Sequence, residues 1–335
     1  MDKKTKNTLH YLFWVLVAVV LLYFCLRAVD WKLFGAALQQ CRWSYVFLSM
    51  ALGVVVLWIR GARWQMMLAP IDPSISVVSS FNAYSIGMAV NLALPRAGEL
   101  ARLGYAVKHS ATDAEGRKLL SFDKALGTLL TERVLDTLIV LGMVAVLLCS
   151  QWEKDGSFLL RELSQVISNT GLWLLLGGIL LVSGVFLALL FAFRKKGGIW
   201  SKLWGFGAGI WSGLLSFRHM KRAWLFLLYT ALIWFFYWLM SACILWSLQD
   251  WEVFAPFTPG DAFLLMVVGC LSSVIPVPGG FGAYHGAVAG AFSSLWNIPM
   301  GTGMIYATLN HESQVFTHAL CGLCSYLHEN FFRKG

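Results

Sequence analysis

Long apolar runs separated by short polar segments dominate this chain. A membrane crossing takes about 20 residues as a helix, so each apolar run of comparable length predicts a transmembrane helix. The runs are 9–26, 45–59, 125–149, 171–193, 223–248 and about 301–327. The run 45–59 is short, but Trp43 and Trp64 flank it, which is typical of helix ends at a membrane surface.

Two further apolar stretches, 77–94 and 262–277, lead into segments rich in proline and glycine. The first is Ala-Leu-Pro-Arg-Ala-Gly-Glu-Leu-Ala-Arg at 93–102, and the second is Ile-Pro-Val-Pro-Gly-Gly-Phe-Gly-Ala-Tyr-His at 275–285. Proline removes a backbone donor and glycine weakens a helix, so both segments predict helix breaks. Paired breaks in the two halves of a membrane protein are typical of a transport site.

Lys and Arg residues choose between the topologies, because cytoplasmic loops are enriched in them. We place the N-terminus inside and give each broken stretch an even number of crossings. The Lys and Arg residues that then lie outside are only Arg27, Lys32, Arg42, Lys154 and Arg161, and Arg133 falls within a span. If 77–94 crossed once, the basic segments 96–124 and 194–222 would lie on the opposite side of the membrane from the basic N-terminus. The enrichment of Lys and Arg in cytoplasmic loops disfavours that arrangement. Both termini are therefore expected in the cytoplasm.

The predicted fold is an all-α polytopic membrane protein. It has about six full transmembrane helices and two Pro/Gly-broken elements, either re-entrant hairpins or short helix pairs. Because 45–149 and 223–328 then run in opposite directions, they form an inverted repeat. One membrane domain, 1–335, is expected, with a first helix and outer loop in 1–44. Residues 150–222 would hold a connecting helix and a cytoplasmic amphipathic segment, with an interfacial helix at 199–217.

Composition agrees with a membrane protein: 58% of the residues are hydrophobic, 13% are charged, and the mean hydropathy is +0.68. These values exclude a water-soluble domain of this length. No small-residue cleavage site follows 9–26, so we expect this run to be retained as a helix and not removed as a signal peptide. The net charge of +9 is attributed to membrane topology, and no nucleic-acid partner is expected.

Charged residues in and after the first break are candidate lipid ligands. Arg96, Glu99 and Arg102 recur every three residues, so on a helix they share a broad face, and two guanidinium groups could grip a phosphate. The alternative is a solvated helix start on the cytoplasmic side.

Three charges lie within the predicted span 125–149. Glu132, Arg133 and Asp136 would be about 12–18 Å deep at 1.5 Å per residue, where charge is costly and typical of a functional interior. A structural ion-pair network is the alternative, and the two roles can coexist.

Glycines in the second break are candidates for anion binding. Gly279, Gly280 and Gly282 permit backbone conformations closed to other residues, and the following helix would direct N–H groups at a bound phosphate. A sharp turn without a ligand remains the alternative.

Histidines supply the remaining candidates. His311 and Gln314 share a polar stripe with His318 in the last span, and His285 follows the second break. Histidine titrates near neutral pH, which would allow a proton-coupled step, whereas hydrogen-bonded packing is the alternative. No compact metal motif accompanies them, so zinc is less favoured and neither a metal nor a cofactor is expected.

Three segments in order resemble the signature motifs of the lysylphosphatidylglycerol synthase transmembrane, or flippase-like, family. They are Asn-Leu-Ala-Leu-Pro-Arg-Ala-Gly-Glu-Leu-Ala-Arg at 91–102, Thr-Glu-Arg-Val-Leu-Asp at 131–136 and Pro-Val-Pro-Gly-Gly-Phe-Gly at 276–282. In the family's best-known member this region is the flippase part, and a separate soluble domain attaches lysine to phosphatidylglycerol. The chain ends at Gly335 without such a domain, so the resemblance implies translocation without synthesis.

The chain departs from the family pattern at two positions. His285 stands where many members carry Glu, and His311 stands where many carry Arg. Gly-Ala-Tyr-His at 282–285 and His-Glu-Ser-Gln at 311–314 are similar to a His-bearing branch. The resemblance therefore leaves the identity of the lipid open.

The leading functional hypothesis is a non-enzymatic translocase in the bacterial cytoplasmic membrane. It would move a phosphate-bearing lipid, either an anionic phospholipid or a polyprenyl phosphate, between leaflets by alternating access. One alternative is a membrane-embedded enzyme acting on a lipid-linked phosphate or sugar, although no recognised catalytic motif appears. Another is a non-transporting partner of a lipid-synthesis enzyme. A second copy of the chain is the remaining candidate partner.

Overall fold

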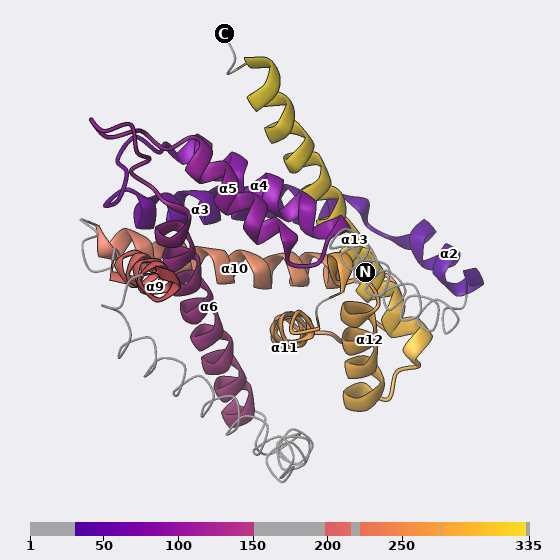
Figure 1. Cartoon of the computed structure of the whole chain (residues 1–335). Coiled ribbons are helices and arrows are strands. Elements are labelled where there is room, and N and C mark those ends of the chain that lie inside the picture. The colour runs from indigo at the N-terminus through magenta and orange to yellow at the C-terminus, as the bar shows by residue number, and fades with distance from the viewer. Residues whose placement is uncertain (1–30, 151–197, 216–221, 276, 333–335) are drawn as a thin grey trace, which may run out of the picture. The chain divides into compact units, whose positions relative to one another are not determined.

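The computed structural model describes residues 31–150, 198–215, 222–275 and 277–332, and these residues are overwhelmingly helical (Figure 1). Across these ranges there is no strand, only an isolated bridge between Thr112 and Lys118. The all-α fold class is therefore confirmed. The predicted spans 9–26 and 171–193 lie outside the described residues.

The helices follow the predicted apolar stretches closely. They are α2 (Trp31–Gln40), α3 (Trp43–Leu68), α4 (Val77–Ala93), α5 (Ala97–Lys108), α6 (Phe122–Ser150), α9 (Gly198–Leu215), α10 (Ala223–Ser247), α11 (Pro259–Ser272), α12 (Ala283–Trp296) and α13 (Met300–Leu327), with short turns η2 (Pro278–Gly280) and η3 (His328–Phe332). Helix α2 was not anticipated in the expected outer loop. Among the described helices, α3 and α10 are both long and apolar enough to cross a membrane.

Helix α3 is longer than the apolar run that predicted it. The run ends at residue 59, but the helix continues to Leu68 through Arg60 and Arg63, both of which are buried. The predicted topology counts both arginines on the cytoplasmic side, and the structure buries their side chains within the protein. A hydropathy pattern ends at the first arginine, whereas a helix continues when the arginine finds partners inside the protein.

Contacts divide the chain into two compact units. One comprises Met1–Leu120 and Met220–Gly335, and the other comprises Ser121–His219. From the predicted repeat 45–149 the first unit contains α3 and the broken pair α4–α5. From the repeat 223–328 it contains α10, the broken pair α11–α12, and α13. The second unit contains α6 and α9, which pack against each other where Gly209 faces the Asp123 side chain. The predicted domain boundaries stay a prediction.

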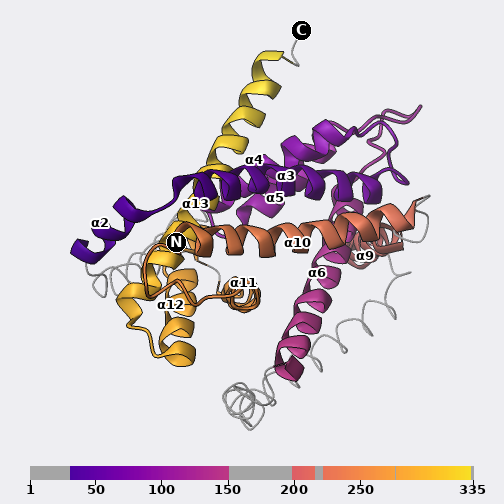
Figure 2. The same cartoon turned by 180° about the vertical axis from the view of Figure 1, so that it is seen from behind.

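In the first unit, α3 and α10 lie side by side, and α11 and α12 lie next to the C-terminal part of α10 (Figures 1 and 2). Aromatic and aliphatic side chains from α10 to α13 form the largest apolar core, which includes Ile244, Leu265, Phe292 and Tyr306. The Tyr306 hydroxyl lies 2.6 Å from the Ser241 hydroxyl, so even the polar atom of this buried ring has a partner. This core holds the second break against the last helix.

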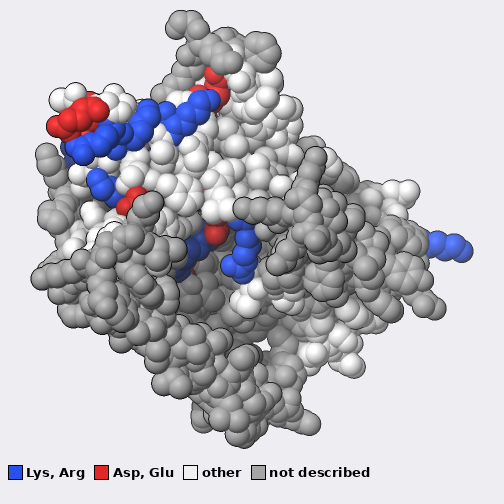
Figure 3. Space-filling view, in the orientation of Figure 1, with Lys and Arg blue, Asp and Glu red and all other residues white. Residues whose placement is uncertain are grey.

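A buried aspartate secures the polar end of the first unit. Burial disfavours the Asp72 carboxylate, but the Ser110 and Ser74 hydroxyls, each at 2.6 Å, and the Ser74 and Ala111 N–H groups donate to it. These bonds outweigh burial and hold the pKa of Asp72 below its ordinary value. They tie the end of α5 to the end of α3. Charged residues gather over the loop that follows α5 (Figure 3), where Arg117 pairs with Asp113 at 3.1 Å.

Both broken elements are hairpins with short arms. Helices α4 and α5 have 17 and 12 residues, and α11 and α12 have 14 each. All four are shorter than the roughly 20 residues of a full crossing. The arms pack tightly: a Cβ on Gly98 would meet the Gly87 carbonyl far inside van der Waals contact, and one on Gly269 would lie 2.5 Å from the Tyr284 ring.

We expect Gly98→Ala to destabilise the protein by about 1–3 kcal/mol, because the added methyl group overlaps a backbone carbonyl that cannot rotate away. Gly104→Ala is the matched control, since it lies on the same helix with nothing within 4 Å of the added atom. Thermal unfolding of the purified proteins in one detergent measures the difference. Equal midpoints for the two variants would contradict the close α4–α5 packing.

Candidate functional site

The two helix breaks lie against each other in the first unit. Helix α4 contacts η2, and the Leu92 carbonyl is 3.5 Å from where a Cβ on Gly279 would be. Across the same junction the Arg96 Nη2 atom is 3.5 Å from the Val274 carbonyl oxygen. Segments about 180 residues apart in the sequence therefore form one region, which we call the break junction: the described residues 92–98, 274–275 and 277–285.

The backbone at the junction adopts left-handed conformations. Gly279, Gly280 and Gly282 have φ values of 57°, 80° and 79°, so this turn requires glycine. Arg96 has a φ of 61°, which is unusual for a residue with a side chain. Such local strain concentrates at functional sites.

Two helices begin at the junction. Arg96 and Gly282 are the N-cap residues of α5 and α12, and neither provides a side-chain cap to its helix. The Gly98 N–H instead donates to the Asn91 Oδ1 atom at 2.8 Å. Helix N-termini carry partial positive charge, so the junction favours an anionic ligand.

The three charged residues of α5 have different surroundings. The Arg96 side chain is exposed, Glu99 is half-buried and Arg102 is buried at 3% exposure. The Arg102 guanidinium carbon lies 3.8 Å from the centre of the Trp64 ring and 4.3 Å from that of Tyr84. It therefore stacks between aromatic rings, and the exposed guanidinium of this set is that of Arg96.

Histidines from both sides of the second break meet. His311 Nε2 lies 2.8 Å from the Gly279 carbonyl oxygen, and its Nδ1 lies 3.2 Å from Glu312 Oε1. His285 Nε2 lies 3.6 Å from the same carboxylate oxygen, and the two imidazole rings are 4.8 Å apart. We call His285, His311 and Glu312 the histidine cluster. The sequence singled out the two histidines, and the structure joins Glu312 to them.

Gln314, predicted as a site residue, faces a different helix. Its amide donates to the Ser49 hydroxyl at 3.3 Å, and its oxygen would lie 2.7 Å from a Cβ on Gly53. It therefore joins α13 to α3 beside the histidine cluster.

The remaining predicted residues lie in the second unit, on α6. Glu132 and Asp136 are buried, with 0% and 8% exposure, whereas Arg133 is exposed. Thr131 and Thr137 bond backward to carbonyls of the same helix, at Gly127 and Arg133. Two buried carboxyl groups on one helix fit either predicted role, the substrate path or the ion-pair network.

Sequence reasoning missed two buried arginines of α3. Arg60 Nε donates to the Tyr237 hydroxyl at 2.8 Å, and its Nη1 donates to the Tyr84 hydroxyl at 2.7 Å. Arg63, fully buried, lies 3.4 Å from the Thr230 hydroxyl and 5.7 Å from the centre of the Phe226 ring. Their spacing of three residues on a span-length helix was the available signal.

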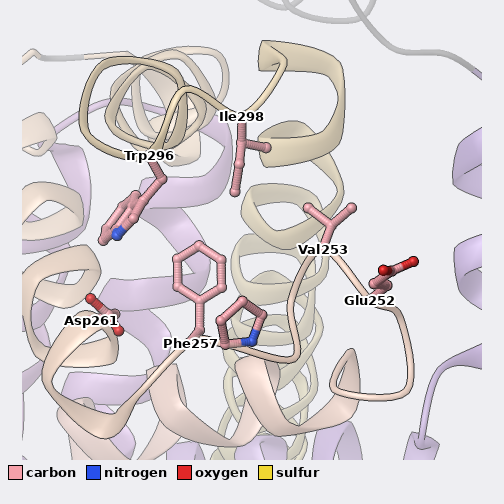
Figure 4. A pocket seen from close by; sticks show the side chains of 7 residues that line it. Glu252, Val253, Phe257, Asp261, Trp296 and Ile298 are labelled. Carbon is pink, nitrogen blue, oxygen red and sulfur yellow. The ribbon is translucent and has the colours of Figure 1, made fainter.

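A shallow pocket of about 350 Å³ lies elsewhere in the first unit (Figure 4). Its lining is mainly apolar, with the rings of Phe257 and Trp296 5.0 Å apart. Asp261 is one of its two acids and already caps α11 through Thr258. Because none of the sequence-predicted site residues lines this pocket, we place the candidate site at the break junction.

Comparison with known proteins gives one match. The family model described as "Lysylphosphatidylglycerol synthase TM region" matches residues 11–322. No curated protein and no solved structure matches the chain.

We expect Tyr237→Phe to lower the free energy of unfolding by about 1–3 kcal/mol, because the buried Arg60 guanidinium loses an acceptor. Tyr229→Phe is the control on the same helix: Tyr229 is half-buried and makes no hydrogen bond with any residue in the described ranges. Tyr229→Phe should change the free energy of unfolding by no more than about 0.5 kcal/mol. Thermal unfolding distinguishes them, and an unchanged midpoint for Tyr237→Phe would contradict the assigned bond.

Proposed function

Because the chain belongs to the lysylphosphatidylglycerol synthase TM region family, we propose that it translocates a phosphate-bearing lipid between membrane leaflets. The family is a transmembrane region, so the chain is a membrane protein. The proposal concerns the transport activity of the chain and the lipid that it moves. The lipid is an anionic phospholipid or a polyprenyl phosphate, and the membrane is the bacterial cytoplasmic membrane.

The observation that carries this proposal is the meeting of the two breaks. An exposed guanidinium, that of Arg96, lies where α5 begins and beside the chain that leads into the glycine turn. The N-terminus of α12 follows that turn. A positive side chain and two helix N-termini at one junction suit a phosphate group, which accepts several charge-assisted hydrogen bonds at once.

The surroundings of Arg96 suit the apolar part of a lipid. Leu94 and Leu100 on its own segment are 41% and 58% exposed, and Val274 and Ile275 across the junction are 71% and 48% exposed. Exposed apolar side chains beside a cation match the two chemical parts of an anionic lipid. A free phosphate would gain nothing from them.

The short hairpin arms support alternating access. Backbone broken at membrane depth occurs where it is buried in protein or lines a wet cavity. In the proposed mechanism the hairpins belong to an inverted repeat and meet at the binding site, and rocking of the repeats exposes it to each leaflet in turn. Glu99 would line the path at the junction, and the histidine cluster would gate it. Glu132, Arg133 and Asp136 stay candidates for the path within the second unit.

We expect Arg96→Gln to slow lipid exchange about tenfold or more, because a charged hydrogen bond to phosphate contributes about 1.5–3 kcal/mol. Purified protein in vesicles, followed with labelled phosphatidylglycerol, polyprenyl phosphate and phosphatidylcholine, gives the rates. Arg117→Gln is the matched control, since Arg117 is also exposed but pairs with acids in a loop. Equal rates for both variants, or no acceleration by folded wild-type protein, would count against the proposal.

The histidine cluster supports a second candidate, a membrane-embedded enzyme acting on a lipid-linked phosphate or sugar. Two imidazoles and a carboxylate within reach of one another can exchange protons with a substrate. Mass analysis of lipids from the same vesicles separates the candidates. A changed lipid, formed by wild-type protein and not by His285→Ala, would favour the enzyme.

The proposed topology predicts that the loops at 109–121 and 248–258 face opposite sides of the membrane. In a background with all seven native cysteines replaced by serine, Glu252→Cys should react with an impermeant thiol reagent in intact cells, and Glu115→Cys should not. Glu115→Cys should react in inverted vesicles. Both native residues are exposed, so accessibility within the protein does not limit labelling. Labelling of both introduced cysteines from the same side of the membrane would contradict the inverted repeat.

A further inference from the structure

The hydrogen bond at the glycine turn fixes the protonation of His311. A carbonyl oxygen only accepts, so His311 Nε2, 2.8 Å from the Gly279 oxygen, carries a hydrogen. In the neutral ring, Nδ1 then holds a lone pair, and it faces Glu312 Oε1 at 3.2 Å. A lone pair facing a carboxylate oxygen is repulsive unless a proton or a metal ion lies between the two atoms.

His285 brings a second nitrogen to the same carboxylate oxygen. Its side chain is 2% exposed, its Nε2 lies 3.6 Å from Glu312 Oε1, and its Nδ1 is buried without a hydrogen-bond partner in the described ranges. At 3.6 Å the Nε2 contact is itself beyond hydrogen-bond distance. The imidazole therefore has no hydrogen bond within the described residues, which is costly for a buried polar group.

The spacing of the three groups matches metal coordination. Ligand atoms about 2.0–2.2 Å from a tetrahedral zinc ion lie roughly 3.3–3.6 Å apart. Here two of the separations are 3.2 and 3.6 Å, and one ligand atom from each residue lies within 4.8 Å of the others. Metal binding requires the two imidazole nitrogens to come within the same range of each other.

We propose that His285, His311 and Glu312 bind a divalent transition-metal ion of the zinc class. Two imidazoles and one carboxylate are a ligand set that zinc accepts while keeping a fourth position for water or an anion. The bond from His311 to Gly279 is the outer contact that orients a metal-binding histidine. A proton shared by His311 and Glu312 would satisfy that pair alone, whereas a metal ion also gives His285 a partner.

The proposed metal site is tested without lipid, so the outcome does not depend on transport. Protein purified through a tag free of histidine is treated with a chelator and titrated with Co²⁺, and then with Zn²⁺. Wild-type protein should bind about one ion per chain, gain a visible absorption band with Co²⁺, and unfold at a higher temperature with saturating metal.

Glu312→Gln and His285→Asn should each weaken Co²⁺ binding about tenfold or more, because the first replaces an anionic oxygen by a neutral one and the second removes an imidazole nitrogen. Glu312 is one-third exposed, so its isosteric variant is the one expected to fold normally. His318→Asn is the matched control: it changes a histidine on the same helix, two turns from His311. It should bind Co²⁺ as wild-type protein does.

Unfolding temperatures in chelator establish that the variants are folded before binding is compared. Absence of a Co²⁺-dependent absorption band in wild-type protein would overturn the metal site. A proton shared by His311 and Glu312 would then explain their contact. Undiminished binding in Glu312→Gln would overturn the metal site as well. Lipid exchange is measured separately, on wild-type protein and Arg96→Gln, so failure of the metal site and failure of the transport proposal are distinguishable.

Discussion

The bond from His311 to the Gly279 carbonyl is the interaction on which the second break depends. A helix break frees backbone groups that have no water partner at membrane depth, so each must find one within the protein. At the first break the Asn91 side chain accepts from the Gly98 N–H group in the same way. Both partners come from helices packed against the break, which explains why the breaks are rigid turns built into the helical core.

A second constraint is the burial of positive charge. Arg60, Arg63 and Arg102 lie inside the first unit, where aromatic faces and hydroxyl groups surround them. Tyr84 serves two of them, accepting from Arg60 and stacking on Arg102. Arginine suits this role because its delocalised charge is weakly hydrated and stacks on rings. The exposed Arg96 is thereby distinguished from its neighbours as the guanidinium available to a ligand.

Hydrophobic patterning predicted the helices well and their surroundings poorly. The ends of α10 and α13 fall within a residue of the apolar runs, because proline, glycine and charge mark those ends in the sequence. Helix α3 extends beyond the predicted end at residue 59, because Arg60 and Arg63 are buried against tyrosines and a threonine of other helices. The histidines of the cluster were foreseen, but Glu312 as their partner was not. Their closeness depends on how α12 packs against α13, which no local spacing records.

The two breaks carry charge of the same sign once the histidine cluster holds a metal ion. Without it, the second break offers Glu312, a carboxylate that repels the phosphate favoured by Arg96. A divalent ion reverses that sign and leaves one net positive charge beside the helix N-terminus. Both sides of the junction would then attract an anionic head group.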